Sequence, residues 1–307
     1  MQEYPMTFEE FVTRFGTDEQ CRDYLYQLRF SCGFVCPRCQ NSKSWPIGES
    51  LFECSKCGHQ TSVIAGTIFQ DTRTSLKTWF TAIWWLTTQK NGASAKGLQQ
   101  VLGLKSYKTA WTWLHKIRKA MVYPNRTKLS GTIEVDEAYI GGEESGGKTG
   151  RGTENKTLVA IAVELGVKGQ LGRARLSVVA NASGKSLQQF IKNNVESGST
   201  IISDGWKGYN SLVSEGYCHI VHLKKEATSE DDLLPNAHRI ISLLKRWLLG
   251  THQGAVSGKH LQAYLDEYTF RFNRRKSAQR GLLFYRLLEC AMLVGPTTMG
   301  ELISCEP

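Results

Sequence analysis

Four cysteines near the N-terminus have the spacing of a metal site. The segment CPRCQNSKSWPIGESLFECSKCGHQ, residues 36–60, contains two Cys-x2-Cys pairs separated by fourteen residues. Each pair forms a tight turn that brings two sulfurs to one ion, and Zn²⁺ binds four such thiolates tetrahedrally at about 2.3 Å. We therefore predict a structural zinc site rather than redox-active or coincidental pairs. Its ligands are Cys36, Cys39, Cys54 and Cys57.

Two other potential ligands near these pairs are predicted to be bystanders. Cys32 precedes the first pair and His59 follows the second, but four thiolates already close a structural site. The total of nine cysteines is odd, which does not suggest a disulfide framework. We interpret the remaining cysteines as small apolar residues; they are Cys21, Cys218, Cys290 and Cys305.

Two aspartates in the second half of the chain indicate a different metal chemistry. The segment GTIEVDEAYIGG, residues 131–142, alternates apolar and polar residues and predicts a strand that contains Asp136. A second strand pattern, STIISDGWKGY at 199–209, delivers Asp204 at its end. Aspartate is disfavoured in strands, and a buried aspartate must be paired or bound to a metal. Hard ions such as Mg²⁺ prefer carboxylate oxygens, and two ions about 3.5 to 4 Å apart can catalyse phosphoryl transfer. Glu137 should point to the opposite face of its strand and is predicted to be structural.

A third ligand is less clearly indicated. The amphipathic segment LPNAHRIISLLKRWLLGTHQG, residues 234–254, places His238 and Lys245 two helical turns apart on nearly the same face. A neutral imidazole can bind a divalent ion, although Mg²⁺ prefers harder ligands, and Lys245 can contact a phosphate as a point charge. The spacing alone leaves open a carboxylate from the acidic segment just before this helix, namely Glu226, Glu230, Asp231 or Asp232.

The elements around these residues occur in a recognisable order. Runs rich in β-branched residues predict further strands at 157–166, 173–182 and 218–223, and helical patterns occur at 184–195 and about 206–215. With the two aspartate strands and the His238 helix, the order is β-β-β-α-β-α-β-α, which is ribonuclease-H-like. The three-stranded meander leaves its first strand central, and the crossover helix brings the fourth strand beside it in parallel. Asp136 and Asp204 should then lie close together.

The region before residue 129 is predicted to be mostly helical around the zinc site. Capping-box patterns at Thr7/Glu10 and Thr17/Gln20 begin two short helices. The tryptophan-rich segment 75–90 has helical spacing that favours a core role for its aromatic residues. Residues 94–121 have helix-turn-helix spacing, with one helix ending near Gly103 and the next beginning near Ser106. A plain helical hairpin would give the same spacing, but the basic residues on the second helix favour DNA binding. They are Lys105, Lys108, Lys116, Arg118 and Lys119.

The charge of the chain favours a polyanionic partner. The net charge is +10 and the pI is about 9.1, and residues 64–128 contain eleven Lys or Arg but only one acid, Asp71. A second basic run, RFNRRKSAQR at 271–280, has no acid. Either run could be a solvated helix face. We instead predict salt-sensitive phosphate contacts from Arg271, Arg274 and Arg275.

Together these motifs resemble bacterial insertion-sequence transposases that join an N-terminal zinc ribbon to a DDE-type domain. The likeness spans about residues 5–290 and is carried by the four cysteines, TSVIAGTIFQDTRTSLKTWFTAIWW, EVDEAYIGG, SDGWKGY and the segment that begins LLKRWLLGTHQG. It implies cleavage and strand transfer with two Mg²⁺ or Mn²⁺ ions, which Asp136 and Asp204 help to bind. In that family the third ligand lies seven residues before the lysine of LLKR and is Glu, Asn or His. This pattern favours His238 as the ligand and Lys245 as a phosphate contact.

The expected protein is therefore a multidomain α+β DNA transposase. We predict four regions: 1–66 with the zinc ribbon, 67–128 with the helix-turn-helix, 129–255 as the catalytic domain and 256–307 as C-terminal helices. The partners are double-stranded DNA, both terminal inverted repeats and target, and further copies of the chain. No stretch of 18 apolar residues occurs and the N-terminus is acidic, so we expect a cytoplasmic, nucleoid-associated bacterial protein without membrane contact. The alternatives are a DNA-binding regulator with an inactive catalytic domain and a metal-dependent nuclease.

Overall fold

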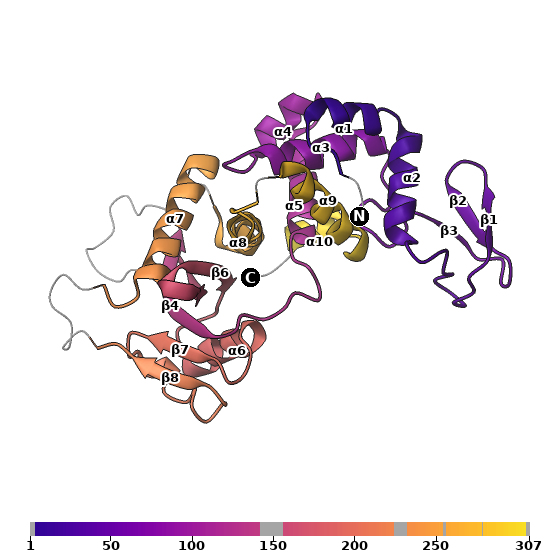
Figure 1. Cartoon of the computed structure of the whole chain (residues 1–307). Coiled ribbons are helices and arrows are strands. Elements are labelled where there is room, and N and C mark those ends of the chain that lie inside the picture. The colour runs from indigo at the N-terminus through magenta and orange to yellow at the C-terminus, as the bar shows by residue number, and fades with distance from the viewer. Residues whose placement is uncertain (1–3, 142–155, 224–231, 254–255, 278, 305–307) are drawn as a thin grey trace. The chain divides into compact units, whose positions relative to one another are not determined.

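The structure is a computed structural model that describes residues 4–141, 156–223, 232–253, 256–277 and 279–304. The chain divides into two compact units, formed by Met1–Pro124 with Ser277–Ser304 and by Asn125–Lys276. Each unit combines helices with one sheet, so the predicted multidomain α+β class is confirmed (Figure 1). The predicted C-terminal region, 256–307, is divided between the two units, because its first helix packs on the second sheet and its next helix enters the first unit's aromatic core.

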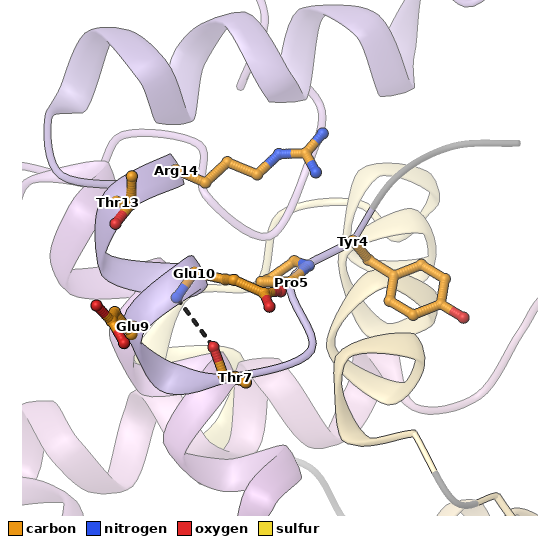
Figure 2. A pocket seen from close by; sticks show the side chains of 7 residues that line it. All are labelled: Tyr4, Pro5, Thr7, Glu9, Glu10, Thr13 and Arg14. Carbon is orange, nitrogen blue, oxygen red and sulfur yellow. Dashed lines mark hydrogen bonds between the residues drawn. The ribbon is translucent and has the colours of Figure 1, made fainter.

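Two short helices open the first unit, α1 (Phe8–Arg14) and α2 (Asp18–Arg29). At α2 the predicted capping box is complete, because Thr17 and Gln20 exchange side-chain hydrogen bonds with each other's backbone N–H. At α1 the Thr7 hydroxyl accepts from the Glu10 N–H at 3.1 Å (Figure 2). The Glu10 carboxylate, however, accepts from the Met6 N–H rather than from Thr7. The exposed start of α1 borders an open pocket whose lining includes both Thr7 and Glu10.

An aromatic cluster holds the helices of the first unit together. Phe284 of α9 (Arg280–Leu293) packs against four rings, those of Phe11, Phe15, Phe80 and Trp84. The last two rings belong to α3 (Leu76–Thr88), whose buried aromatic face confirms its predicted core role. Burial of several large rings is a dominant source of stability in such a bundle. Helix α10 (Met299–Ser304) follows α9.

The predicted helix-turn-helix segment forms two helices, α4 (Ala95–Leu102) and α5 (Tyr107–Ala120). Gly103 ends α4 in the left-handed region with φ of +62°, which a residue with a side chain rarely adopts. Trp113 of α5 stacks on Trp79 of α3, with ring centroids 3.8 Å apart. The hairpin is thereby anchored to the core by its apolar face.

A three-stranded antiparallel sheet surrounds the cysteine pairs, with strands β1 (Ser44–Ile47), β2 (Leu51–Cys54) and β3 (Gln60–Ser62). Strands β1 and β2 lie between the two cysteine pairs, and β3 follows the second pair. Arg29 at the end of α2 donates to the carbonyl oxygens of Ser62, Val63 and Ala65. This guanidinium ties the end of the small sheet to the N-terminal helices.

The second unit contains a five-stranded sheet with the order β6-β5-β4-β7-β8. The first three strands form an antiparallel meander, and β4 pairs in parallel with β7. This is the predicted ribonuclease-H-like arrangement, with the first strand of the meander at the centre. The strand bounds are β4 (Thr132–Gly141), β5 (Lys156–Leu165), β6 (Leu171–Val178), β7 (Thr200–Ser203) and β8 (Cys218–Val221).

Helices cover both faces of this sheet (Figure 1). One face packs on α7 (Pro235–His252) and α8 (Gly258–Asn273) through a cluster that includes Ile161, Ile240 and Leu265. The other face packs on α6 (Gly184–Asn194) through Val135, Leu187 and Ile191. Side chains alternate between faces along a strand, so even-numbered residues of β4 face α7 and odd-numbered residues face α6.

The prediction of a helix at about 206–215 is wrong. The segment forms a single 3-10 turn, η2 (Lys207–Tyr209), followed by turns. Gly208 interrupts the pattern, and Gly216, with φ of +85°, directly follows the segment. A second 3-10 turn, η1 (Val167–Gly169), connects β5 to β6. Within the described residues no helix combines the length and the apolar character that crossing a membrane requires.

Candidate functional site

The four predicted zinc ligands form one cluster. The sulfurs of Cys36, Cys39, Cys54 and Cys57 all lie within 4.8 Å of one another. The Cys36 and Cys57 sulfurs are 3.7 Å apart, and those of Cys39 and Cys54 are 3.5 Å apart. Four thiolates at about 2.3 Å from a tetrahedral ion would be separated by about 3.8 Å. The cluster therefore fits a structural Zn²⁺, and it includes neither Cys32 nor His59.

Each cysteine pair is shaped by the residue that follows it. Gln40 and Gly58 both have left-handed backbone, with φ of +60° and +65°. Their N–H groups donate to the carbonyls of Cys36 and Cys54, which closes each turn around the metal position. Glycine in CGHQ meets this need without strain, whereas the first turn accepts glutamine.

The sheet register brings the two predicted aspartates together. Residues 132–134 of β4 pair in parallel with residues 200–202 of β7. Continuing this register by two places sets Asp136 beside Asp204, which follows β7 directly. Gly205 then turns the chain with φ of +83°, and a Cβ there would meet Leu223 at 2.8 Å. The Trp206 N–H donates to the Asp204 carboxylate at 3.1 Å and holds it in this turn.

His238 contacts Asp136 from the first turn of α7. Its Nε2 lies 3.4 Å from Oδ2 of Asp136. Its Nδ1 lies 2.5 Å from Oδ1 of Asp232, which also accepts from the Leu234 N–H. A carboxylate on one imidazole nitrogen commonly orients the other nitrogen toward a metal. The alternative ligands Glu226, Glu230 and Asp231 lie outside the described residues.

The electrostatics of Asp136 suit a site that binds cations. Burial raises the pKa of Asp136 to about 6, and the nearby charges of Asp204 and Asp232 act in the same direction. The Glu137 N–H and His238 partly oppose this rise. Burial and nearby negative charges disfavour the ionised form of a carboxylate, and a bound cation stabilises that form again. Two carboxylates and an imidazole are donors that Mg²⁺ or Mn²⁺ can accept. Among the described residues, however, only the four cysteines bring three or more ligand atoms within 4.8 Å of one another.

Glu137 faces the other side of the sheet, as predicted. Its carboxylate accepts from the buried Tyr209 hydroxyl at 2.7 Å. Burial raises the pKa of Glu137, and the hydrogen bond from Tyr209 opposes the rise. Glu137 thus connects β4 to the η2 turn on the α6 face.

Lys245 lies on the exposed side of α7, as His238 does, while Ile240, Leu244 and Leu248 are buried against the sheet. The amphipathic pattern of α7 thus orients both polar residues away from the core.

Glu134, another carboxylate of β4, was not singled out in the sequence analysis. It is buried and bonds to the start of α7.

The basic residues predicted to contact DNA have different surroundings. On and before α5, Lys105, Lys108 and Lys119 are exposed. Burial lowers the pKa of Lys116, and Arg118 is only 1% exposed and donates to the Ala93 carbonyl. Arg118 therefore serves the packing of the helical hairpin rather than its surface.

The three arginines predicted on the C-terminal basic run lie at the end of α8. Arg271 pairs with the fully buried Glu267 at 2.9 Å. Arg274 and Arg275 stack on the rings of Phe270 and Phe272, and Arg275 is exposed. Stacking holds a guanidinium in place while leaving part of it accessible.

Two family models match parts of this chain. Residues 16–60 match the transposase zinc-ribbon domain, and residues 128–273 match the ISXO2-like transposase domain. An uncharacterized protein in the transposable element ISH50 of Halobacterium salinarum is 24% identical over 281 residues, covering 85% of this chain and 92% of that protein. The catalytic core domain of BIV integrase matches with a TM-score of 0.33 and 15% identity, covering 50% of this chain and 89% of that chain.

The cysteine cluster predicts one zinc ion per chain. Cys54→Ser should lose the zinc and the amide protection of β1–β3, because the ligands Cys36 and Cys54 are themselves part of the apolar cluster beside this small sheet. Protection in β4 and β5 should stay unchanged. Metal analysis and hydrogen exchange measure the two effects. Cys32→Ser is the matched control, and loss of zinc from that variant would contradict the assignment.

The raised pKa of Asp136 predicts that the free energy of unfolding of the protein depends on pH. The folded pKa is about 6 against an ordinary 3.8, so this group's contribution to stability is fully present below pH 3.8 and is lost as pH rises through 6. Above pH 7 the ionised group should destabilise the protein by up to about 3 kcal/mol when no divalent ion is added.

Asp136→Asn should therefore be more stable than the wild type at pH 8, and the gain should vanish near pH 4. Urea unfolding at the two pH values measures this difference. Glu196→Gln changes an exposed acid of the same unit and serves as the control. Equal stability of the wild type and Asp136→Asn at pH 8 would show that burial does not disfavour the ionised form of Asp136.

Proposed function

This chain belongs to the insertion-sequence transposases that join a zinc ribbon to an ISXO2-like transposase domain, and we propose that it cuts and joins the DNA ends of its element. The observation that carries the proposal is the meeting of Asp136, Asp204 and His238 at one place on the ribonuclease-H-like sheet. These groups come from two strands and a helix that are far apart in the sequence, so their convergence argues for a shared ligand.

We assign the metal ligands to Asp136, Asp204 and His238. Two Mg²⁺ or Mn²⁺ ions bound there would supply the charge that activates a water for cleavage, activates a 3′-hydroxyl for joining, and stabilises the leaving oxygen. The chain's own part is to hold the ligands. Asp232 orients His238 through Nδ1, and the Trp206 N–H holds the Asp204 carboxylate.

DNA contacts are proposed for three groups of residues. Lys245, on the same exposed side of α7 as His238, is suited to a phosphate near the reacting bond. The exposed lysines at 105, 108 and 119 and the partly buried Lys116 would bind the terminal repeats together with the zinc ribbon. Arg274 and Arg275 would contact further phosphates. Pairing of two element ends requires more than one protomer, so we propose a homo-oligomer on DNA.

The role of His238 is tested with labelled terminal-repeat DNA, Mg²⁺ and the full chain. His238→Ala should lower cleavage and joining by at least about 100-fold, because a metal ligand is lost, and should leave DNA binding unchanged. Gel analysis separates the products. Arg239→Ala alters the neighbouring exposed residue and should stay active.

Three other results would each change the proposal. Near-normal joining by His238→Ala together with an inactive Glu230→Ala would move the third ligand into the preceding acidic segment. Cleavage without joining by the wild type would indicate a nuclease. DNA binding without cleavage would indicate a regulator.

Asp232 is expected to orient His238 rather than to bind the metal. Asp232→Ala should then lower cleavage by about 10- to 100-fold, as is usual for a residue behind a metal-bound histidine. Its effect should be clearly smaller than that of Asp136→Ala, which removes a ligand. Cleavage rates at saturating Mg²⁺ make the comparison, and equal losses in the two variants would make Asp232 a ligand.

A further inference from the structure

Glu134 is a buried carboxylate with an unusual task. It lies two residues before Asp136 on the same face of β4 and is 4% exposed. Its Oε2 accepts from the backbone N–H groups of Asn236 and Ala237, each at 2.8 Å. Its Oε1 accepts from Nδ2 of Asn236, also at 2.8 Å. Three hydrogen bonds to one carboxylate account for its burial.

These bonds replace an ordinary helix cap. The N-cap residue of α7, Leu234, has no side chain that can accept, and Pro235 has no N–H. The N–H groups of Asn236 and Ala237 are the donors that an N-cap side chain normally satisfies. Glu134 satisfies them from a strand 102 residues earlier in the chain. Its negative charge also lies at the positive end of the helix dipole.

The cap and the candidate metal site connect the same two elements. Ala237, which Glu134 holds, directly precedes His238, and Glu134 itself lies one strand repeat before Asp136. Any movement of α7 at the cap therefore changes the 3.4 Å separation between His238 Nε2 and Asp136 Oδ2. A displacement of about 1 Å in a catalytic group can cost about 100-fold in rate.

Leu234 and Ala237 at the start of α7 are buried, but the residues that α7 contributes to the core cluster lie further along the helix. Ile240, Leu244 and Leu248 enter the core cluster, all beyond His238. Loss of the cap would thus leave the body of α7 packed while its first turn becomes free to shift. This separates an effect on the site from a general effect on stability.

We propose that Glu134 is a positioning residue that sets the place of His238 against Asp136 by capping α7 from the central strand. The inference rests on the proposed function, because it takes His238 and Asp136 as ligands of one metal site. It assigns to the first glutamate of EVDE a role distinct from that of the aspartate two residues later.

The test uses the full chain and Mn²⁺ as the probe. Glu134→Leu keeps the volume but offers no acceptor, so the amides of Asn236 and Ala237 should exchange faster and Mn²⁺ affinity should fall by about 10- to 100-fold. Glu134→Gln should retain most of the affinity, because its oxygen can accept from both backbone N–H groups while the Asn236 side-chain amide reverses. Electron paramagnetic resonance measures Mn²⁺ binding, and hydrogen exchange measures the cap.

A double-mutant cycle tells positioning from stability. In a His238→Ala background, Glu134→Leu should cause no further loss of Mn²⁺ affinity, because the group that it positions is gone. Glu164→Leu is the matched control: Glu164 is a β5 carboxylate that accepts from the Ser130 N–H and pairs with Arg173. Its removal should leave Mn²⁺ binding unchanged.

Several outcomes overturn the inference. One is that Glu134→Leu lowers Mn²⁺ affinity equally in the wild-type and His238→Ala backgrounds. Another is that Glu164→Leu lowers Mn²⁺ affinity as much as Glu134→Leu does. The third is that the hydrogen exchange of the Asn236 and Ala237 amides does not change in Glu134→Leu. If Glu134→Leu does not fold, Glu134→Asp replaces it, since the shorter side chain keeps the charge but withdraws the acceptor. If Asp136→Ala binds Mn²⁺ as the wild type does, the proposed function fails, and amide exchange alone then decides whether Glu134 caps α7.

Discussion

The parallel pairing of β4 with β7 is the contact on which the candidate site depends. Backbone hydrogen bonds hold residues 132–134 beside 200–202, and extending this register by two residues sets Asp136 beside Asp204. Two carboxylates at one place repel each other, and burial further disfavours the charge on Asp136. The sheet therefore supplies the free energy that keeps them together, and a bound cation would recover part of it. Such a cost is common where function requires an unfavourable local arrangement.

Helix α7 contributes His238 to the site, and apolar and polar contacts have different roles in placing this helix. Its buried residues, such as Ile240 and Leu244, lay the helix across the sheet without determining where its first turn begins. Hydrogen bonds are directional, so the bonds from Asn236 and Ala237 to Glu134 determine that position. His238, one residue further on, is then held between Asp136 and Asp232. The histidine is exposed, yet its placement depends on buried groups.

Some features of the structure could be predicted from the sequence and others could not. The cysteine turns are local, because each is closed within five residues by one backbone bond, and their spacing alone predicted the cluster. The strand order of the second unit was also predictable, since runs of β-branched residues and a crossover helix allow few arrangements. The helix prediction for 206–215 was wrong because the apolar residues have helical spacing, whereas Gly208 and the flanking Gly205 and Gly216 favour turns. Arg118 has the residue type of a DNA contact, but the packing of α5 encloses it.

The amino-acid sequence by itself determined the four-cysteine cluster, the order of the strands, the position of Asp136 in β4 and that of Asp204 directly after β7. These follow from residue spacing and from the period of each element. It singled out Asp136 but gave no role to Glu134, a carboxylate on the same face of the same strand. Only the packing of α7 made one of them a helix cap and brought the other to His238. The orientation of the imidazole by Asp232 was decided in the same way. Such choices depend on contacts between elements far apart in the chain, and periodicity within an element carries no information about them.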